Sequence, residues 1–185
     1  MKRAARLPDD QRRELQDVYR RNISAVYAFF RYSVDAHTAE DLTAATFERV
    51  MRTWARYDAS RASVELWILT IARNILRDHY RRQRFRSGPS LDEHPALADH
   101  LVVAEEPGQS ALAFDAIRDW LRHLQPRERE VLGLRYGADL SPDEIARCLG
   151  LSRANVHQIS SRALRRLRDV ADRPDADQAD FIYSA

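Results

Sequence analysis

Apolar positions in the first half of the chain recur at intervals of three and four residues, which is the spacing of one helix face. Stretches of this kind cover about residues 9–30, 38–54 and 63–86. Thr38 and Ser63 stand at the starts of the second and third stretches, where a hydroxyl can cap a helix. The pattern therefore predicts amphipathic helices, the last of which ends in a run of arginines.

Helical spacing stops at residues 87–110, where prolines, glycines and acidic residues predict a linker. Beyond the linker the helix boundaries are marked more clearly. Pro126 can open one helix, and the run Ser141–Glu144 supplies a cap, a proline at the first helical position and a glutamate for a capping box. Gly150 can end that helix, and Ser152 can cap the next. The expected fold class is all-α, with two small helical domains joined by a flexible linker.

We expect the domains to cover residues 1–87 and 111–170, with an acidic linker at 88–110 and an acidic tail at 171–185. Disorder is the default expectation for the tail. The alternative hypothesis is that the tail folds back over the basic last helix and weakens DNA binding.

Charge is segregated along the chain, although the net charge is only +2. Arginine is concentrated at residues 73–86 and 162–168, and acidic residues at 92–106 and 169–180. Two basic stretches far apart in sequence indicate two separate contacts with a polyanion.

Several classes of function lack the residues that they need. Cys148 is the single cysteine, and the six histidines form no ligand pair, so neither a disulfide nor a metal site is expected. No phosphate loop or nucleophile elbow is present, which argues against an enzyme, a cofactor or a small-molecule substrate. No apolar run has the length of a membrane span, so a cytoplasmic protein is expected.

Residues 142–167 have the pattern of a DNA-binding helix-turn-helix. Ala146 fits the helix crossing, Gly150 the turn, and Val156 the apolar face of the second helix. An ordinary helical hairpin is the alternative. Helical spacing leaves one set of polar residues for solvent or DNA: Arg153, Asn155, His157, Gln158, Ser161, Arg162 and Arg165.

The segment from Leu124 to Tyr136, followed by Ser141–Ala146 and Val156–Arg168, resembles region four of bacterial RNA polymerase sigma factors. The resemblance implies reading of the minus-thirty-five promoter element and docking on the polymerase β flap. Carried over, Arg153 and Gln158 are base-reading candidates, with His157 beside them. Ala154 departs from the acidic residue common in housekeeping members.

Ala39–Thr43 with Thr46 and Phe47 resembles the region-two helix that grips the β′ clamp helices of the polymerase. Glu40, Asp41 and Phe47 are therefore candidates for polymerase binding. Family members commonly carry Gln-Glu where this chain has Ala44 and Ala45, which leaves fewer polar contacts.

Trp67–Asn74 resembles the adjoining helix, which reads and opens the minus-ten element, and residues 57–65 match the loop that captures a flipped base. An opened strand needs cations for its backbone and a pocket for an unstacked base. The minus-ten candidates are Tyr57, Arg61, Ser63, Arg73, Asn74, Arg77 and Arg81. Val64 replaces a frequent aromatic residue, and Trp54 and Trp67 are expected to belong to the core.

The two resemblances cover about residues 12–86 and 111–168 and imply a sigma factor of the extracytoplasmic-function type. The expected partners are core RNA polymerase, promoter DNA and an anti-sigma protein, without a membrane contact. In the family the acidic linker threads polymerase channels, and a plain solvated linker explains its composition equally well. Two rivals remain: a stand-alone helix-turn-helix regulator, and an adaptor that binds polymerase but not DNA.

Overall fold

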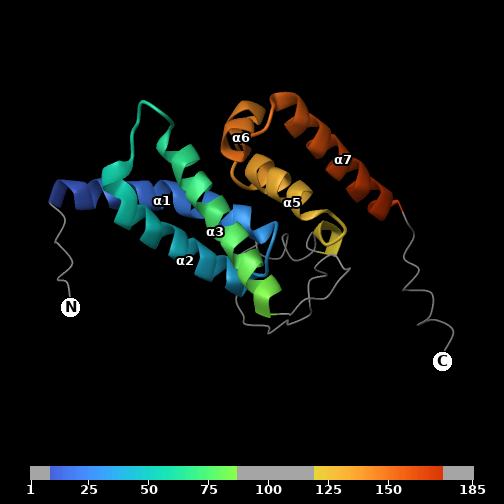
Figure 1. Cartoon of the computed structure of the whole chain (residues 1–185), viewed down its shortest axis with the longest axis horizontal. Helices are drawn as coiled ribbons and strands as arrows, with labels where there is room; N and C mark the ends of the chain where they lie inside the picture. Colours follow the sequence, from blue (N-terminus) through green and yellow to red (C-terminus); the bar gives the residue numbers. More distant parts are fainter. Residues whose placement is uncertain (1–8, 87–118, 173–185) are drawn as a thin grey trace.

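The computed structural model describes residues 9–86 and 119–172, and all regular elements in these ranges are helical. The first half contributes α1 (Asp9–Arg31), α2 (Ala36–Thr53) and α3 (Val64–Arg86). These three long helices lie together in one half of the molecule (Figure 1). The predicted all-α fold with two helical units is confirmed.

The second half is built from shorter elements, apart from its last helix. It contains α5 (Pro126–Leu132), the π-helical segment η2 (Gly133–Gly137), α6 (Pro142–Leu149) and α7 (Arg153–Ala171). A short 3₁₀ turn, η1 (Trp54–Arg56), follows α2 in the first half. Figure 1 shows α6 and α5 between α3 and the long outer helix α7.

Most of the predicted helix boundaries are confirmed, and one cap is different. The Ser63 hydroxyl accepts a hydrogen bond from the Leu66 amide, 3.3 Å away. The cap of α2 is Asp35 rather than Thr38, because Asp35 Oδ1 accepts from the Thr38 amide at 2.9 Å. Asp35 lies one residue before α2, where a carboxylate also suits the positive end of the helix dipole.

A complete capping box starts α6. The Ser141 hydroxyl accepts from the Glu144 amide, and the Glu144 carboxylate accepts from the Ser141 amide at 2.9 Å. Gly150 ends the helix in the left-handed conformation with φ of 64°. Ser152 then caps α7 through the Asn155 amide at 3.2 Å. The turn between the two helices is therefore fixed by residues whose conformations the sequence predicts.

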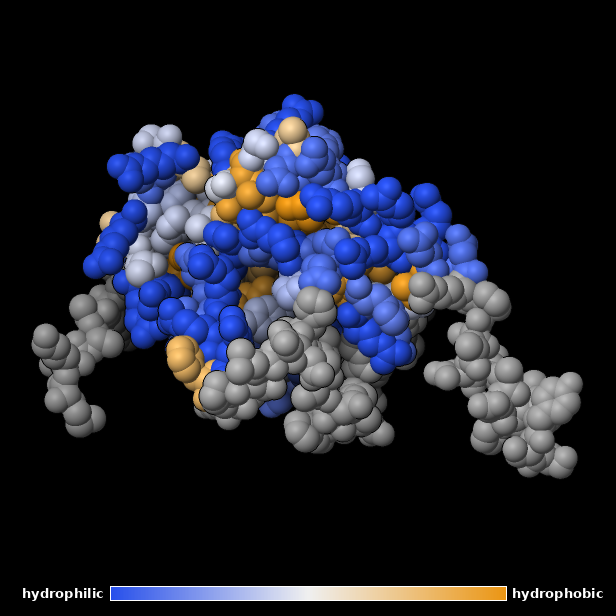
Figure 2. Space-filling model, turned by 45° about the vertical axis from the view of Figure 1, so that its right-hand side comes forward, coloured by the Kyte–Doolittle hydropathy of each residue, from blue (hydrophilic) through white to orange (hydrophobic). Residues whose placement is uncertain are grey.

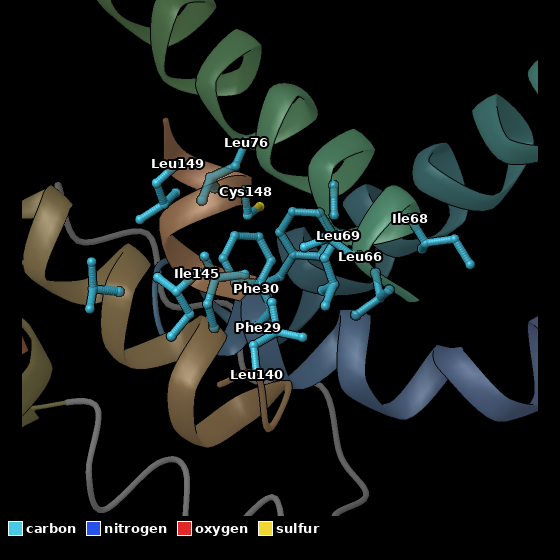
Figure 3. Packing of buried hydrophobic residues seen from close by; sticks show 14 of the residues in the cluster. Phe29, Phe30, Leu66, Ile68, Leu69, Leu76, Leu140, Ile145, Cys148 and Leu149 are labelled. Carbon is cyan, nitrogen blue, oxygen red and sulfur yellow. The ribbon is translucent and has the colours of Figure 1, made fainter. Parts of the chain in front are cut away.

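The two halves share one hydrophobic core. Phe29 and Phe30 of α1 are fully buried, together with Ile145 of α6. Figure 3 shows these side chains in one cluster with Leu69 and Leu76 of α3 and with Cys148 and Leu149 of α6. Tyr32 packs against a second, smaller cluster, Leu121, Leu124, Leu132 and Ala163.

Two glycines permit the closest approach between the halves. A Cβ added at Gly133 would lie 3.0 Å from the Phe29 carbonyl oxygen, and one at Gly137 would lie 3.0 Å from the Ala28 carbonyl carbon. The neighbouring atoms belong to the backbone of α1 and cannot rotate away. Any larger residue at either position must push η2 off α1.

The predicted linker and acidic tail lie outside the described residues, except for the start of the tail at Ala171 and Asp172. The predicted domain limits remain predictions. Within the described ranges, no helix is long and apolar enough to cross a membrane.

We expect Ser141→Ala to lower the free energy of unfolding by about 1 kcal/mol, since the cap of α6 is lost. Hydrogen bonds from the Ser141 side chain and amide lower the pKa of the Glu144 carboxyl. A lowered folded-state pKa stabilises the protein above the unfolded-state pKa, and this contribution is lost as pH falls through the lowered value.

Urea unfolding of both proteins, followed by circular dichroism at several pH values, measures this change. Ser24→Ala is the matched control, because Ser24 is exposed within α1 and should change stability by less than about 0.5 kcal/mol. Equal stability of the Ser141→Ala variant and the wild type would contradict the assigned cap.

Candidate nucleic-acid interface

The outer helix α7 has a buried stripe and a polar face. Val156, Ile159 and Ala163 are buried, and α7 packs on α5 and α6 through this side. Six of the seven predicted residues are exposed: Arg153, His157, Gln158, Ser161, Arg162 and Arg165. Asn155 is half-buried. The structure therefore brings the predicted set together on one accessible helix face.

Figure 2 is turned so that the side of the molecule that carries α7 comes forward, and hydrophilic residues dominate the surface in this view. On α7, Ser161, Leu164, Arg165 and Arg168 line an open depression. A helix that presents arginine and amide side chains in this way fits the major groove of DNA, where these groups can reach base edges and phosphates.

One candidate base-reading residue has an acidic neighbour. The Arg153 guanidinium lies 3.4 Å from the Asp143 carboxylate, and both side chains are about 60% exposed (63% and 62%). Because Asp143 belongs to α6, the pair connects the two helices of the helix-turn-helix. An exposed pair of this kind contributes little stability and can be replaced by a phosphate or a base.

An aromatic cluster supports the segment between η1 and α3. The Tyr57 ring stacks on Trp54 with centroids 5.3 Å apart, and its centroid lies 5.2 Å from that of Trp67. The Tyr57 hydroxyl donates to the Ala62 carbonyl at 3.1 Å, which ties the start of the segment to its end. Both tryptophans pack against the core, as their apolar stripes predict.

Polar contacts order the tip of the same segment. The Asp58 carboxylate accepts from the Ser60 hydroxyl at 2.6 Å and from the Ser60 amide at 3.0 Å, and these hydrogen bonds lower its pKa. Arg61 pairs with Asp58 at 3.4 Å and is exposed, as is Ser63. The tip therefore presents the Arg61 cation beside the aromatic side chains that support the segment. This combination suits the binding of an unpaired nucleotide.

The predicted residues of α3 divide into two groups. Asn74, Arg77 and Arg81 are exposed, and Arg81 pairs with Asp78 at 3.1 Å on the surface. Arg73 instead points into the contact between the two halves, where its side chain is 15% exposed.

Arg73 is held by two groups of the second half. Its Nε donates to Glu130 Oε1 at 2.9 Å, and its Nη1 donates to the Cys148 carbonyl at 3.2 Å. Arg127 also pairs with Glu130 and donates to the Leu149 carbonyl at 3.4 Å. A carboxylate that is 11% exposed thus lies between two arginines, one from each half of the molecule.

Two further polar contacts flank this ion group. The Thr70 hydroxyl lies 3.7 Å from the Cys148 sulfur, across the contact between α3 and α6. Burial raises the pKa of the Cys148 thiol, which keeps it protonated near neutral pH. Burial also raises the pKa of Tyr80, and the nearby Arg129 of α5 opposes this effect.

The third predicted surface lies on α2. Glu40 and Asp41 are exposed, and Asp41 lies 4.0 Å from His37. Phe47 is buried and packs edge-on against Tyr19 with centroids 4.8 Å apart. Glu40 and Asp41 therefore form the accessible part of this surface, whereas the buried Phe47 side chain packs α2 against α1.

Sequence reasoning missed Glu130 and Thr70, because their role depends on a contact between the halves. Gly133 and Gly137 carried a signal: glycine occurs only five times in the chain, and these two stand four positions apart. In the described ranges no group of histidine, cysteine and acidic side chains is arranged to hold a metal ion.

Family comparisons match both halves of the chain. Sigma-70 region 2 matches residues 18–86, and sigma-70 region 4 matches residues 120–169. These ranges contain the loop with α3 and the helix-turn-helix, respectively.

Curated relatives and a solved structure agree with this match. The chain is 32% identical over 154 residues to the ECF RNA polymerase sigma factor BldN of Streptomyces coelicolor, covering 81% of this chain and 57% of BldN. It is 30% identical over 141 residues to ECF sigma factor ShbA of Streptomyces griseus, covering 74% of this chain and 73% of ShbA.

The fold is similar to that of sigma factor RpoE from Bartonella quintana, crystallised with the anti-sigma factor NepR. The TM-score is 0.68 at 23% identity, with 90% of this chain and all of the RpoE chain covered (100%). The match to two sigma regions and to ShbA establishes the family. The chain belongs to the extracytoplasmic-function group of RNA polymerase sigma factors, which are transcription initiation factors that act with RNA polymerase at promoter DNA.

Proposed function

We propose that this sigma factor reads its promoter with two separate surfaces. The exposed polar face of α7 contacts the minus-thirty-five element, and the tip of residues 58–63 together with the exposed side of α3 engages the minus-ten element. The observation that carries this proposal is the face of α7, which holds six exposed polar residues opposite a fully packed apolar stripe. We retain the domain limits 1–87 and 111–170 as part of the proposal.

The two surfaces have different tasks. Arg153 and Gln158, near the start of α7, are placed for base edges, and Arg162 and Arg165 for phosphates one turn later. On α3, Asn74 and Arg77 lie beside the duplex upstream of the opening, and the loop receives an unpaired base against Tyr57. Opening is driven by binding energy, without covalent chemistry, so the protein is not an enzyme.

Polymerase binding is assigned to α2. Glu40 and Asp41 project from this helix into solvent, and Phe47 anchors it on α1. Ala44 is exposed beside them and supplies no polar contact. Core polymerase is therefore engaged mainly through charge, at the β′ clamp helices, with the second half docking at the β flap.

An anti-sigma protein is the regulator proposed for this chain. The support is indirect: the similar sigma factor RpoE was crystallised with the anti-sigma factor NepR. Because polymerase and promoter DNA lie in the cytoplasm of bacteria, we also assign the protein to that compartment.

The direct test of the proposed function mixes the purified chain with sigma-free core polymerase and a promoter library, and sequences the transcripts. We expect new start sites that share two elements. Binding to duplex DNA without any dependence on polymerase would instead favour a stand-alone regulator. Polymerase binding without new start sites would favour an adaptor.

Arg153→Ala and Gln158→Ala should each reduce transcription from the identified promoter about tenfold, because each removes a base contact of the size seen in major-groove pairs. Base preference at one position of the upstream element should relax in each variant. Arg13→Ala and Gln16→Ala are matched controls on the exposed face of α1. Unchanged preference in both test variants would show that α7 does not read the bases.

Arg77→Ala should slow promoter opening severalfold, because one phosphate contact is lost. The salt dependence of binding should also decrease by about one counterion. A fluorescent base analogue in the minus-ten element measures opening directly, and Arg20→Ala on α1 is the control. An equal opening rate in the Arg77→Ala and Arg20→Ala variants would remove α3 from the proposed interface.

A further inference from the structure

We infer that the acidic tail, residues 173–185, binds back onto the open depression of α7 and competes there with DNA. The inference rests on the proposed function of α7 and adds a second occupant for the later half of this helix. The depression is lined by Ser161, Leu164, Arg165 and Arg168. All of them are exposed, and α7 is the outermost helix, so the site is open to another segment (Figure 1).

An apolar residue lies within the depression. Leu164 is 40% exposed, although it stands on the polar face of α7. It lies one helical turn from Ser161 and from Arg168, so these side chains flank it on the same stripe. The aliphatic stems of Arg165 and Arg168 extend the apolar surface and place a guanidinium group at the end of each stem. A peptide that combines an apolar run with adjoining acidic residues therefore matches the depression.

The two arginines of the depression have no acidic partner within the part of the chain that the structure describes. No Asp or Glu side chain there lies within ion-pair distance of Arg165 or Arg168. Arg166, which stands on another side of the helix, instead lies 3.4 Å from Glu128 of α5. Two cations beside an exposed leucine thus remain available for carboxylates or phosphates.

The tail contains both kinds of group that the depression requires. Its acidic residues are Asp175, Asp177 and Asp180, and the last of them directly precedes an apolar run at 181–183. The carboxylates can pair with the guanidinium groups, while the apolar run covers Leu164. Charges of opposite sign therefore face each other, and apolar groups adjoin the charged groups on both sides of the contact.

The length of the tail permits this contact. α7 ends at Ala171, and at a rise of about 1.5 Å per residue Leu164 lies about 11 Å back along the helix. Residues 172–180 span up to about 30 Å when extended, which is enough to reverse direction and bring Phe181 to the depression. A short tether gives an effective concentration of about 1 mM, so a contact with a Kd of about 0.1 mM is about 90% occupied.

Binding of the tail blocks only part of the DNA surface of α7. Ser161 and Arg165 belong both to the depression and to the proposed minus-thirty-five set. Arg153 and Gln158 lie nearer the start of the helix, outside the depression. The tail carboxylates therefore take the place of DNA phosphates, which lowers DNA affinity and leaves base preference unchanged.

A photo-cross-link tests the contact in the full chain without DNA. Tyr183→p-benzoylphenylalanine should cross-link within the monomer to α7 around Leu164, and mass spectrometry locates the link. Leu164→Ser should lower the yield about fivefold, because the apolar contact is lost. Met51→Ser, which changes an exposed apolar residue of α2, should leave the yield unchanged. A link to another element, or only between two copies of the chain, overturns the inference.

DNA affinity tests the competition. Fluorescence anisotropy measures the weak binding of the polymerase-free chain to duplex DNA that carries the upstream element. A chain without residues 173–185 should bind about tenfold more tightly than the full chain, in line with about 90% occupancy by the tail. A variant with serine at 181–183, which keeps every acid, should gain the same factor. Tyr136→Ser, which changes an exposed aromatic residue of η2, is the control and should bind like the full chain.

Two results of the affinity measurement would overturn the inference. Equal affinity of the full and shortened chains would show that the tail does not compete with DNA. A gain on deletion without a gain in the serine variant would show that the acids repel DNA without occupying the depression.

The outcomes also separate the inference from the proposed function. If holoenzyme starts transcripts but no cross-link to α7 forms, the proposed function stands and the inference fails. If the cross-link forms but holoenzyme starts no transcripts with or without the tail, the proposed function fails, and competition with promoter DNA fails with it. A cross-link to α7 together with tighter DNA binding by the shortened chain and the serine variant supports the inference.

Discussion

The distance between α1 and η2 is the constraint on which the rest of the structure depends. Backbone meets backbone at Gly133 and Gly137 with no room for a Cβ, and this approach brings the two halves into van der Waals contact. Only at this separation can Tyr32 enter the small cluster of the second half and Phe30 reach α6. The hydrophobic core of this sigma factor therefore belongs to both halves.

Buried charges then favour this particular arrangement of the two halves. A carboxylate buried in an apolar contact is costly unless cations and hydrogen-bond donors surround it. Glu130 receives Arg127 from its own half and Arg73 from the other, so it is fully compensated only when the halves are together. The same guanidinium is suited to a phosphate in an opened promoter. Arg73 is thus both part of the contact between the halves and a residue proposed for the minus-ten surface.

The two proposed promoter surfaces differ in how far they are preformed. The face of α7 is ready as it stands, because its cap, its turn and its apolar stripe all lie within the second half. The minus-ten surface is preformed at the aromatic cluster of Trp54, Tyr57 and Trp67, and incomplete at Arg73. This difference follows from position: α7 is the outermost helix, whereas one side of α3 forms part of the shared core.

The sequence by itself determined the helices, most of their caps and the polar face of α7. These features depend on neighbours three or four residues away, so a periodic pattern and a serine or glycine at the right position are sufficient to predict them. The cap of α2 was misplaced by three residues, because Asp35 and Thr38 are both plausible caps and only the backbone conformation distinguishes them. Tertiary structure alone decided that Arg73 turns toward Glu130 and that the halves share a core. These outcomes depend on contacts between residues that are distant in sequence. Arg73 and Glu130 are 57 positions apart, and a local sequence pattern cannot predict a contact over such a separation.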